Sequence, residues 1–217
     1  METMTIGIIG AGALGSNLGR AFAKAGISAV ISNSRGPESL AKLVGELGPT
    51  IRAGTTLEAA KADIVFLALR WADLKKVLGG LPAWNGRIVV DATNPVEWID
   101  PSSPEAGDPA NPLAAYGIKA VDLGGRHSSS VVRDLVPGAR LVKAFNHFDV
   151  RLLPQPAVSG GQRVLFYSGD DADAKAAVRG LMEKSGFFPI DLGALDIGGP
   201  LASLPGPLNG VSLVKIS

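Results

Sequence analysis

The 217-residue chain is predicted to be an α/β protein built on a mostly parallel sheet. Three observations predict this fold class. Apolar runs of strand length alternate with segments of helical period as far as about residue 191, which is typical of right-handed βαβ units. A glycine-rich turn follows the first apolar run. Hydrophobic residues make up 46% of the chain, enough to bury a large core.

The N-terminal part shows the alternation most clearly. The run DIVFLAL at 63–69 is continuously apolar after its first residue, as expected of a parallel strand that is buried on both faces. Gly36-Pro37 suits a helix start, because proline lacks the backbone N–H that the first helical turn leaves unpaired. In chain order we expect strands at 5–9, 29–32, 51–53, 63–69 and 87–91, and helices at 14–25, 37–47, 57–61 and 71–78.

The C-terminal part continues the pattern around two irregular segments. Residues 96–117 are rich in Pro, Asp, Ser and Ala, which predicts a long loop near the rim of the sheet. The tail from Gly193 to Ser217 holds many Gly and Pro with scattered Leu, which predicts a packed irregular segment with one short helix. The regular elements expected here are strands at 119–122, 140–145, 163–168 and 188–191 and a helix at 172–185.

Composition excludes several classes of function. The formal net charge is +1 and there is no basic run, so neither nucleic acids nor membranes are expected partners. The chain has no cysteine and only two histidines, His127 and His147, so no metal site is expected. No apolar run approaches the roughly 20 residues of a membrane span, and residues 1–5 do not resemble an export signal, which predicts a cytoplasmic protein. Chemistry is therefore expected from a bound organic cofactor.

The run GAGALG at 10–15 has the spacing G-x-G-x-x-G, directly after a strand and at the start of an amphipathic helix. Gly10 would permit the tight turn, Gly12 would let the backbone approach a pyrophosphate, and Gly15 would let the helix lie close to the strand. Ala13 and Leu14 complete the turn, so that the helix N-terminus faces the phosphates. The run predicts a Rossmann-type, doubly wound fold that binds a dinucleotide; the alternative is a tight turn without a ligand.

The end of the second strand indicates which dinucleotide is bound. NAD-binding proteins carry an acidic residue there that accepts from the ribose 2′-hydroxyl, whereas this chain has Asn33, Ser34 and Arg35. A guanidinium binds phosphate in a bidentate fork, and neighbouring hydroxyl and amide groups add donors. These residues predict NADP(H) rather than NAD(H). The alternative is that Arg35 is a solvated loop residue.

Further candidate residues follow later strands, because a dinucleotide crosses the carboxyl ends of a doubly wound sheet. Arg70 is either a ligand-binding residue or a surface residue that starts the next helix. Asn94 and Pro95 form a turn whose backbone is expected to meet the nicotinamide. The candidates at these positions are the runs Leu69-Arg70-Trp71, Asp91-Ala92-Thr93-Asn94-Pro95 and Asn146-His147. Leu69, Arg70, Asn94 and Pro95 are the predicted cofactor-binding residues among them, and Asn146 and His147 the predicted catalytic ones.

Five runs together resemble one family, the NADPH-dependent coenzyme F420 reductases. They are GIIGAGALGS at 7–16, SNSRG at 32–36, VVDATNP at 89–95, LVKAFNH at 141–147 and YSGDD at 167–171. The resemblance implies one Rossmann-type domain over 1–217 with a small C-terminal αβ extension, in which 1–97 binds NADP and 98–217 holds the acceptor site and the tail. It also implies a homodimer, a 2′-phosphate site at Ser34 and Arg35, and an acceptor that docks near Asn146 and against the tail.

The predicted activity is hydride transfer between NADP(H) and a small planar acceptor such as coenzyme F420 or a flavin. Such chemistry mainly needs orientation and exclusion of water. Asn146 is expected to bond the nicotinamide amide or the acceptor, and His147 either donates a proton or is an exposed residue at a strand end. Two alternatives remain. One is a non-catalytic NADP sensor, and the other is a reductase of imines or 2-hydroxy acids, which would need a long helical second domain.

Overall fold

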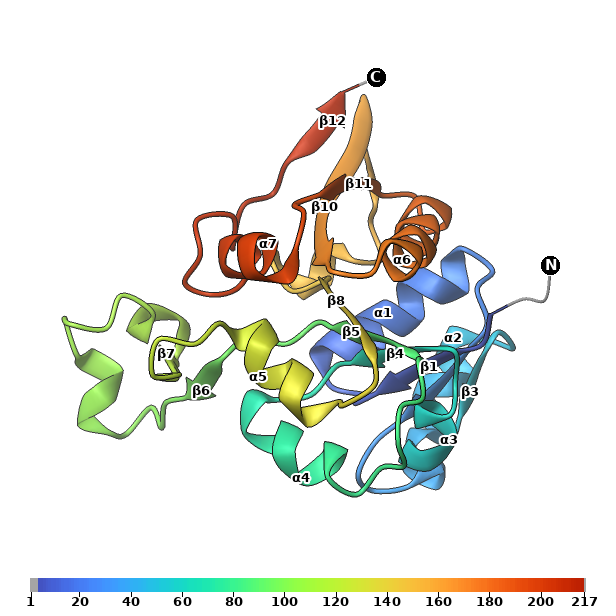
Figure 1. Cartoon of the computed structure of the whole chain (residues 1–217), viewed down its shortest axis with the longest axis horizontal. Helices are drawn as coiled ribbons and strands as arrows, with labels where there is room; N and C mark the ends of the chain where they lie inside the picture. The colour runs from blue at the N-terminus through green and yellow to red at the C-terminus, as the bar shows by residue number, and fades with distance from the viewer. Residues whose placement is uncertain (1–3, 217) are drawn as a thin grey trace.

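The computed structural model describes residues 4–216, and its centre is a ten-stranded sheet (Figure 1). Six neighbouring strands of this sheet are parallel to one another. The next strand runs antiparallel to them, and the edge strand beyond it is parallel to that one. The predicted α/β, Rossmann-type fold with a mostly parallel sheet is therefore confirmed. The spatial order is β11 (Phe188–Asp191), β10 (Gly161–Gly169), β8 (Arg140–Ala144), β5 (Ile88–Asp91), β4 (Ile64–Leu67), β1 (Ile6–Ile9), β2 (Ala29–Ser32) and β3 (Ile51–Ala53).

Helices cover both faces of this sheet, which explains why its strands are apolar at consecutive positions. Alternate side chains of a strand enter opposite layers: Ile8 and Phe66 pack in one hydrophobic cluster, and Ile9 and Leu67 in the other. The first layer contains α1 (Ala13–Lys24), α2 (Ala41–Leu47) and α6 (Ala172–Lys184). The second contains α3 (Thr56–Ala60), α4 (Leu74–Leu78), α5 (Ser128–Leu135) and α7 (Leu195–Ala202).

Short elements lie at the ends of the regular ones. The helices expected at 37–47 and 71–78 each begin with a 3₁₀ turn, and the short helix expected in the tail is α7. Two small strands extend the N-terminal end of β10 by antiparallel pairing. The 3₁₀ turns are η1 (Pro37–Leu40), η2 (Trp71–Asp73), η3 (Pro104–Gly107), η4 (Ala114–Tyr116) and η5 (Val150–Leu152), and the small strands are β9 (Ala157–Val158) and β12 (Val214–Ile216).

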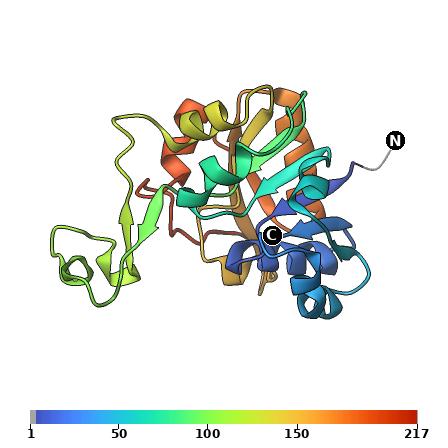
Figure 2. The same ribbon diagram turned by 90° about the horizontal axis from the view of Figure 1, so that it is seen from below.

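Residues 96–120 form an arm that projects from the body of the molecule in both views (Figures 1 and 2). Its base is a two-stranded antiparallel sheet of β6 (Val96–Trp98) and β7 (Ile118–Ala120), with η3 and η4 beyond. Two predictions are corrected here: 96–117 is not wholly a loop, and the strand expected at 119–122 does not join the main sheet. The edge of β5 is instead paired with β8, so β7 pairs within the arm.

Three phenylalanines form the centre of the first layer beneath the carboxyl end of β8. Phe66 lies edge-on to Phe22 and to Phe145, with ring centroids 5.2 and 5.4 Å apart. Phe145 has a φ of 64°, a left-handed conformation that costs a non-glycine residue roughly 1–2 kcal/mol. Burial of its ring offsets this cost. The unusual backbone turns the chain sharply as β8 ends, directly before Asn146.

Candidate functional site

The glycine-rich turn has the geometry that a dinucleotide site requires. Gly10 has a φ of 108°, and a Cβ there would lie 2.2 Å from the carbonyl oxygen of Ala68. A Cβ at Gly15 would lie 1.8 Å from the carbonyl oxygen of Gly10, so α1 packs on the turn at backbone distance. By contrast, a Cβ at Gly12 meets no heavy atom within 4 Å. Gly10 and Gly15 are thus required by the fold, whereas Gly12 leaves space beside the N-terminus of α1.

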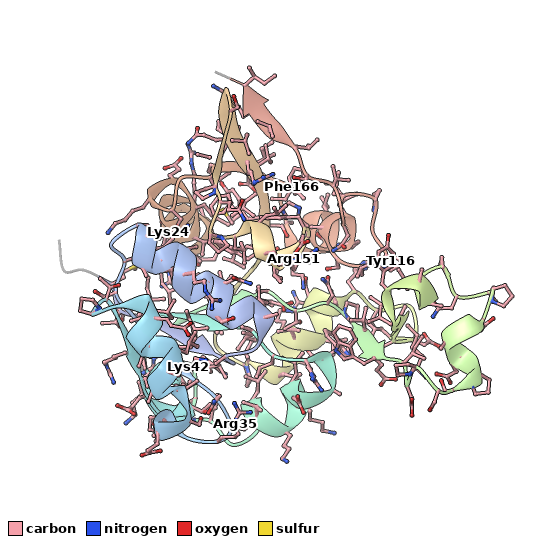
Figure 3. The ribbon with its side chains drawn as sticks, turned by 180° about the vertical axis from the view of Figure 1, so that it is seen from behind. Lys24, Arg35, Lys42, Tyr116, Arg151 and Phe166 are labelled. Carbon is pink, nitrogen blue, oxygen red and sulfur yellow. The ribbon has the colours of Figure 1, made fainter. Side chains whose placement is uncertain are left out.

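The loop after β2 presents an unpaired cation. The side chain of Asn33 shapes this loop: its Oδ1 accepts from the Arg35 backbone N–H at 2.9 Å, and its Nδ2 donates to Ser39 Oγ at 2.9 Å. Ser34 and Arg35 are exposed, and within residues 4–216 the Arg35 guanidinium has neither an ion pair nor a hydrogen bond (Figure 3). The amide of Asn33 is therefore engaged in the loop, whereas Ser34 and Arg35 are free to bind a phosphate.

The segment after β4 contains one residue that packs against the core, Leu69, and a second unpaired cation, Arg70. Leu69 is half-buried and packs against the second layer beside the glycine-rich turn. Arg70 is exposed at the start of η2, and its side chain has no partner in the described part of the chain. Leu69 thus shapes the floor of the site, while Arg70 is available to a ligand.

A fully buried ion pair connects the carboxyl ends of β5 and β8. Lys143 and Asp91 are register partners, both side chains are 0% exposed, and Nζ lies 2.9 Å from Oδ2. The ammonium also donates to the carbonyl of Thr93, and Asp91 Oδ1 accepts from the backbone N–H and the hydroxyl of Thr93 at 2.9 and 2.7 Å. Burial lowers the pKa of Lys143, and the Asp91 carboxylate opposes that change. The pair fixes the turn that carries Asn94.

Asn94 and Asn146 bond each other at the same edge of the sheet. Asn94 Nδ2 donates to the Asn146 carbonyl at 2.8 Å, and Asn146 Nδ2 donates to Asn94 Oδ1 at 3.1 Å and to the Ala202 carbonyl at 3.1 Å. These two acceptors fix the orientation of the Asn146 amide. Its Oδ1 is buried and has no hydrogen-bond partner in the described chain. A buried acceptor of this kind is expected to receive a donor from elsewhere.

The C-terminal segment 203–210 covers this asparagine pair. The Leu204 backbone N–H donates to Asn94 Oδ1 at 3.1 Å, and Asn209 Nδ2 donates to the Asn146 carbonyl at 3.1 Å. Leu208 packs over β10, while Leu213 is exposed. The tail thus contributes directly to the site, and it shields the asparagine pair from water.

His147 lies beneath the same cover and is only 1% exposed, which excludes the alternative of an exposed residue at a strand end. Its Nε2 accepts from the Phe166 backbone N–H at 3.2 Å, and its ring packs against Phe148 and Phe166 with centroids 4.9 and 4.8 Å away. Burial lowers the pKa of His147 to about 4, and the nearby Val211 backbone only partly opposes this. The imidazole is therefore neutral at physiological pH.

Taken together, the predicted residues lie along one edge of the sheet, at the carboxyl ends of β1, β2, β4, β5 and β8. The open space at Gly12, the free Arg35 and the unpartnered Asn146 Oδ1 all belong to this edge. Asp91 belongs to the candidate run after the fifth predicted strand, but its pairing with Lys143 was not predicted from the sequence. Their position inside the apolar runs LVKAF and VVDA was the only indication of a buried pair.

Two further findings concern absences. No group of three or more His, Cys, Asp or Glu side chains able to hold a metal occurs in the described chain. Among residues 4–216, no helix has both the length and the apolar character needed to cross a bilayer.

The sequence model of the family described as NADP oxidoreductase, coenzyme F420-dependent, matches residues 5–95. Among curated proteins, the chain is 26% identical over 207 residues to the metalloreductase STEAP3 of Rattus norvegicus. That alignment covers 94% of this chain but 37% of STEAP3, so the chain spans about a third of the length of this relative.

Two of the similar solved structures align over most of both chains. A hypothetical protein, SMa0349 of Sinorhizobium meliloti, is 40% identical with a TM-score of 0.85 and covers 98% of this chain and 96% of its own. A putative F420-dependent NADP reductase of Arthrobacter sp. FB24 is 25% identical with a TM-score of 0.63, over 89% and 86% of the two chains.

Gly12→Val is expected to weaken NADPH binding at least a hundredfold, or about 2.7 kcal/mol, while the fold stays intact. The branched side chain would occupy the open space beside α1, and the backbone at Gly12, with φ −74° and ψ −162°, is accessible to any residue. A dinucleotide titration measures the affinity, and circular dichroism with thermal unfolding is the control for the fold. Unchanged NADPH affinity would contradict the assignment of the turn.

The free energy of unfolding is expected to fall as the pH is lowered from 7 to 4, with His147 contributing up to about 3 kcal/mol. Below pH 6.5 this imidazole becomes protonated in the unfolded chain but stays neutral in the folded chain. The contribution of His147 to the free energy of unfolding is therefore fully present above pH 6.5 and is lost as the pH falls toward 4. Urea unfolding at several pH values should show a smaller pH dependence for His147→Phe. His127→Phe, at an exposed position, is the control. An equal pH dependence in His147→Phe and wild type would contradict the assignment.

Proposed function

Because residues 5–95 match the family of coenzyme F420-dependent NADP oxidoreductases, and a putative F420-dependent NADP reductase is similar over most of the chain, we propose that the protein is a member of this family. It would transfer a hydride between NADPH and a planar redox acceptor, either coenzyme F420 or a flavin. NADP(H) is the cofactor of this family. The observation that carries the proposal is the buried, unpartnered Oδ1 of Asn146 beside Asn94. It suits the carboxamide N–H of a nicotinamide that lies along the same sheet edge as Arg35.

The residues of the site would bind and orient rather than exchange protons. The N-terminus of α1 and the backbone at Gly12 would hold the pyrophosphate, and Ser34 and Arg35 the 2′-phosphate. Asn146 would fix the plane of the nicotinamide. The 203–210 segment would keep water away from the reacting carbon, which favours hydride transfer over side reactions.

The chemistry needs no acid or base from this chain. When bound, NADPH supplies a hydride from C4, and the acceptor takes that hydride and one proton from solvent, leaving NADP⁺ and the two-electron-reduced acceptor. His147 is neutral and packed between aromatic rings. We therefore assign it a role in positioning Asn146 and the tail, not in proton transfer.

An acceptor screen tests the proposal. NADPH oxidation is followed under anaerobic conditions with coenzyme F420, FMN and FAD, and in parallel with cyclic imines and 2-oxo acids. We expect turnover with at least one ring acceptor. Tight NADPH binding without turnover of any acceptor would contradict the proposal and favour a sensor, whereas turnover of an imine or oxo acid alone would favour the other reductase class.

Arg35→Ala is expected to weaken NADPH binding about tenfold to somewhat over a hundredfold, because a hydrogen bond to a charged group contributes roughly 1.5–3 kcal/mol. NADH binding should hardly change, since NADH lacks the 2′-phosphate. Arg35→Asp should go further and reverse the preference, because a carboxylate repels phosphate and accepts from a free ribose hydroxyl. Ser34→Ala should act in the same direction but more weakly.

The measurement is the dissociation constant of each dinucleotide at one fixed ionic strength, because salt screens charge contacts. Arg179→Ala is the matched control, since it removes an exposed guanidinium that pairs with Glu183 on α6. If wild type binds NADH as tightly as NADPH, or if Arg35→Asp lowers both affinities equally, the assignment of Arg35 to the 2′-phosphate is wrong.

A further inference from the structure

Trp98, on the arm, is 66% exposed. The other two tryptophans of the chain are covered, since Trp84 is 3% exposed and Trp71 is half-buried against the second layer. An indole side chain that stays in water does not gain the large favourable free energy of burial. Aromatic side chains in such positions often bind ligands or partners. Its exposure therefore requires an explanation.

The pairing of the arm shows which way Trp98 faces. Val96 is opposite Ala120 and Trp98 is opposite Ile118. Because side chains alternate along a strand, these four lie on one face of the arm, while Glu97 and Lys119 lie on the other. Ala120 and Trp98 are diagonal neighbours, which brings their Cα atoms to roughly 7–8 Å.

Ala120 lines a cavity of about 230 Å³ at the base of the arm. Its other walls include Pro95, the segment from Val121 to the start of α5 at Ser128, and the tail residues Ser203, Leu204 and Pro205. Pro95 directly follows Asn94, and Leu204 is bonded to Asn94, so the cavity adjoins the asparagine pair. Trp98 does not itself line the cavity, but it lies on the same face of the arm as Ala120, one diagonal position farther from the cavity.

The cavity is smaller than the about 300–1,000 Å³ that typically encloses a drug-sized ligand. A three-ring acceptor that reached the asparagine pair would therefore project beyond it, along the face that carries Trp98. We propose that Trp98 is the stacking platform for this ring and determines the preference for planar aromatic acceptors. The inference rests on the proposed function. It adds a binding residue from the arm to a site otherwise built from the sheet and the tail.

The test compares three variants in NADPH oxidation with FMN and with coenzyme F420. Stacking on an aromatic side chain is expected to change affinity about 5- to 150-fold, so Trp98→Ala should raise the KM for the ring acceptor by a factor in this range. Trp98→Phe should restore most of the loss, because phenylalanine retains an aromatic face. Tyr116→Ala is the control, since Tyr116 is 74% exposed on the same arm but lies outside the β6–β7 pairing that carries Ala120 and Trp98 (Figure 3).

A direct titration separates this inference from the proposed function. Lumiflavin should quench the tryptophan fluorescence of wild type and should quench Trp98→Phe much less, because only Trp71 and Trp84 remain to report. If none of the ring acceptors supports NADPH oxidation by wild type, the proposed function fails. This titration still decides whether Trp98 binds a ring.

Two outcomes would overturn the inference while the proposed function stands. One is an unchanged KM in Trp98→Ala. The other is dissociation of an oligomer by Trp98→Ala in light scattering with no change in KM, which would make Trp98 a contact between copies of the chain.

Discussion

The site depends on one buried ion pair, Lys143–Asp91. Two charges that are withdrawn completely from water cost several kcal/mol each, and only close geometry with further hydrogen bonds compensates for this. Thr93 supplies those bonds, so the turn after β5 has one favourable conformation. A well-packed apolar pair could stabilise the sheet equally well, but it could not hold the Thr93 carbonyl and N–H in place. We therefore infer that the ion pair mainly fixes the conformation of this turn and so holds Asn94 at one position on the sheet edge.

Asn146 contacts Asn94 from the neighbouring strand, and this contact depends on a second energetically unfavourable feature, the backbone conformation of Phe145. Phe145 adopts a left-handed backbone, and its ring is anchored on Phe66. The tail then closes over both asparagines through Leu204 and Asn209, while Asn94 Oδ1 and the Ala202 carbonyl fix the Asn146 amide in one orientation. Each of these steps uses polar groups that bond one another, except for one oxygen. The side-chain amide nitrogens of Asn94 and Asn146 and the Asn94 oxygen all have partners, so the unpartnered Oδ1 of Asn146 is informative about a ligand.

Features held by local interactions could be predicted from the sequence, whereas features held by contacts between residues far apart in the chain could not. The strand–turn–helix at Gly10 to Gly15 was predictable because its constraints are local, and the buried parallel strands were predictable because both of their faces are covered. The arm was missed because β6 and β7 are three residues long and pair across about 20 residues of irregular chain. The Lys143–Asp91 pair joins residues 52 positions apart, and the cover over His147 comes from residues about 60 positions later, so neither follows from local pattern.

The match to the family ends at residue 95, and the arm begins at residue 96. The glycine-rich turn, the Arg35 loop and the Asp91–Pro95 turn all lie inside the matched range, whereas Lys143, Asn146, the arm and the tail lie outside it. The family model thus covers most of the proposed cofactor site, whereas the proposed walls around the nicotinamide lie outside it. Because the proposed dinucleotide contacts come from the backbone and from phosphate-binding side chains, changes in those walls would not disturb them. We therefore expect the identity of the acceptor to depend on residues 96–120 and 203–213, which lie outside the region that the family model matches.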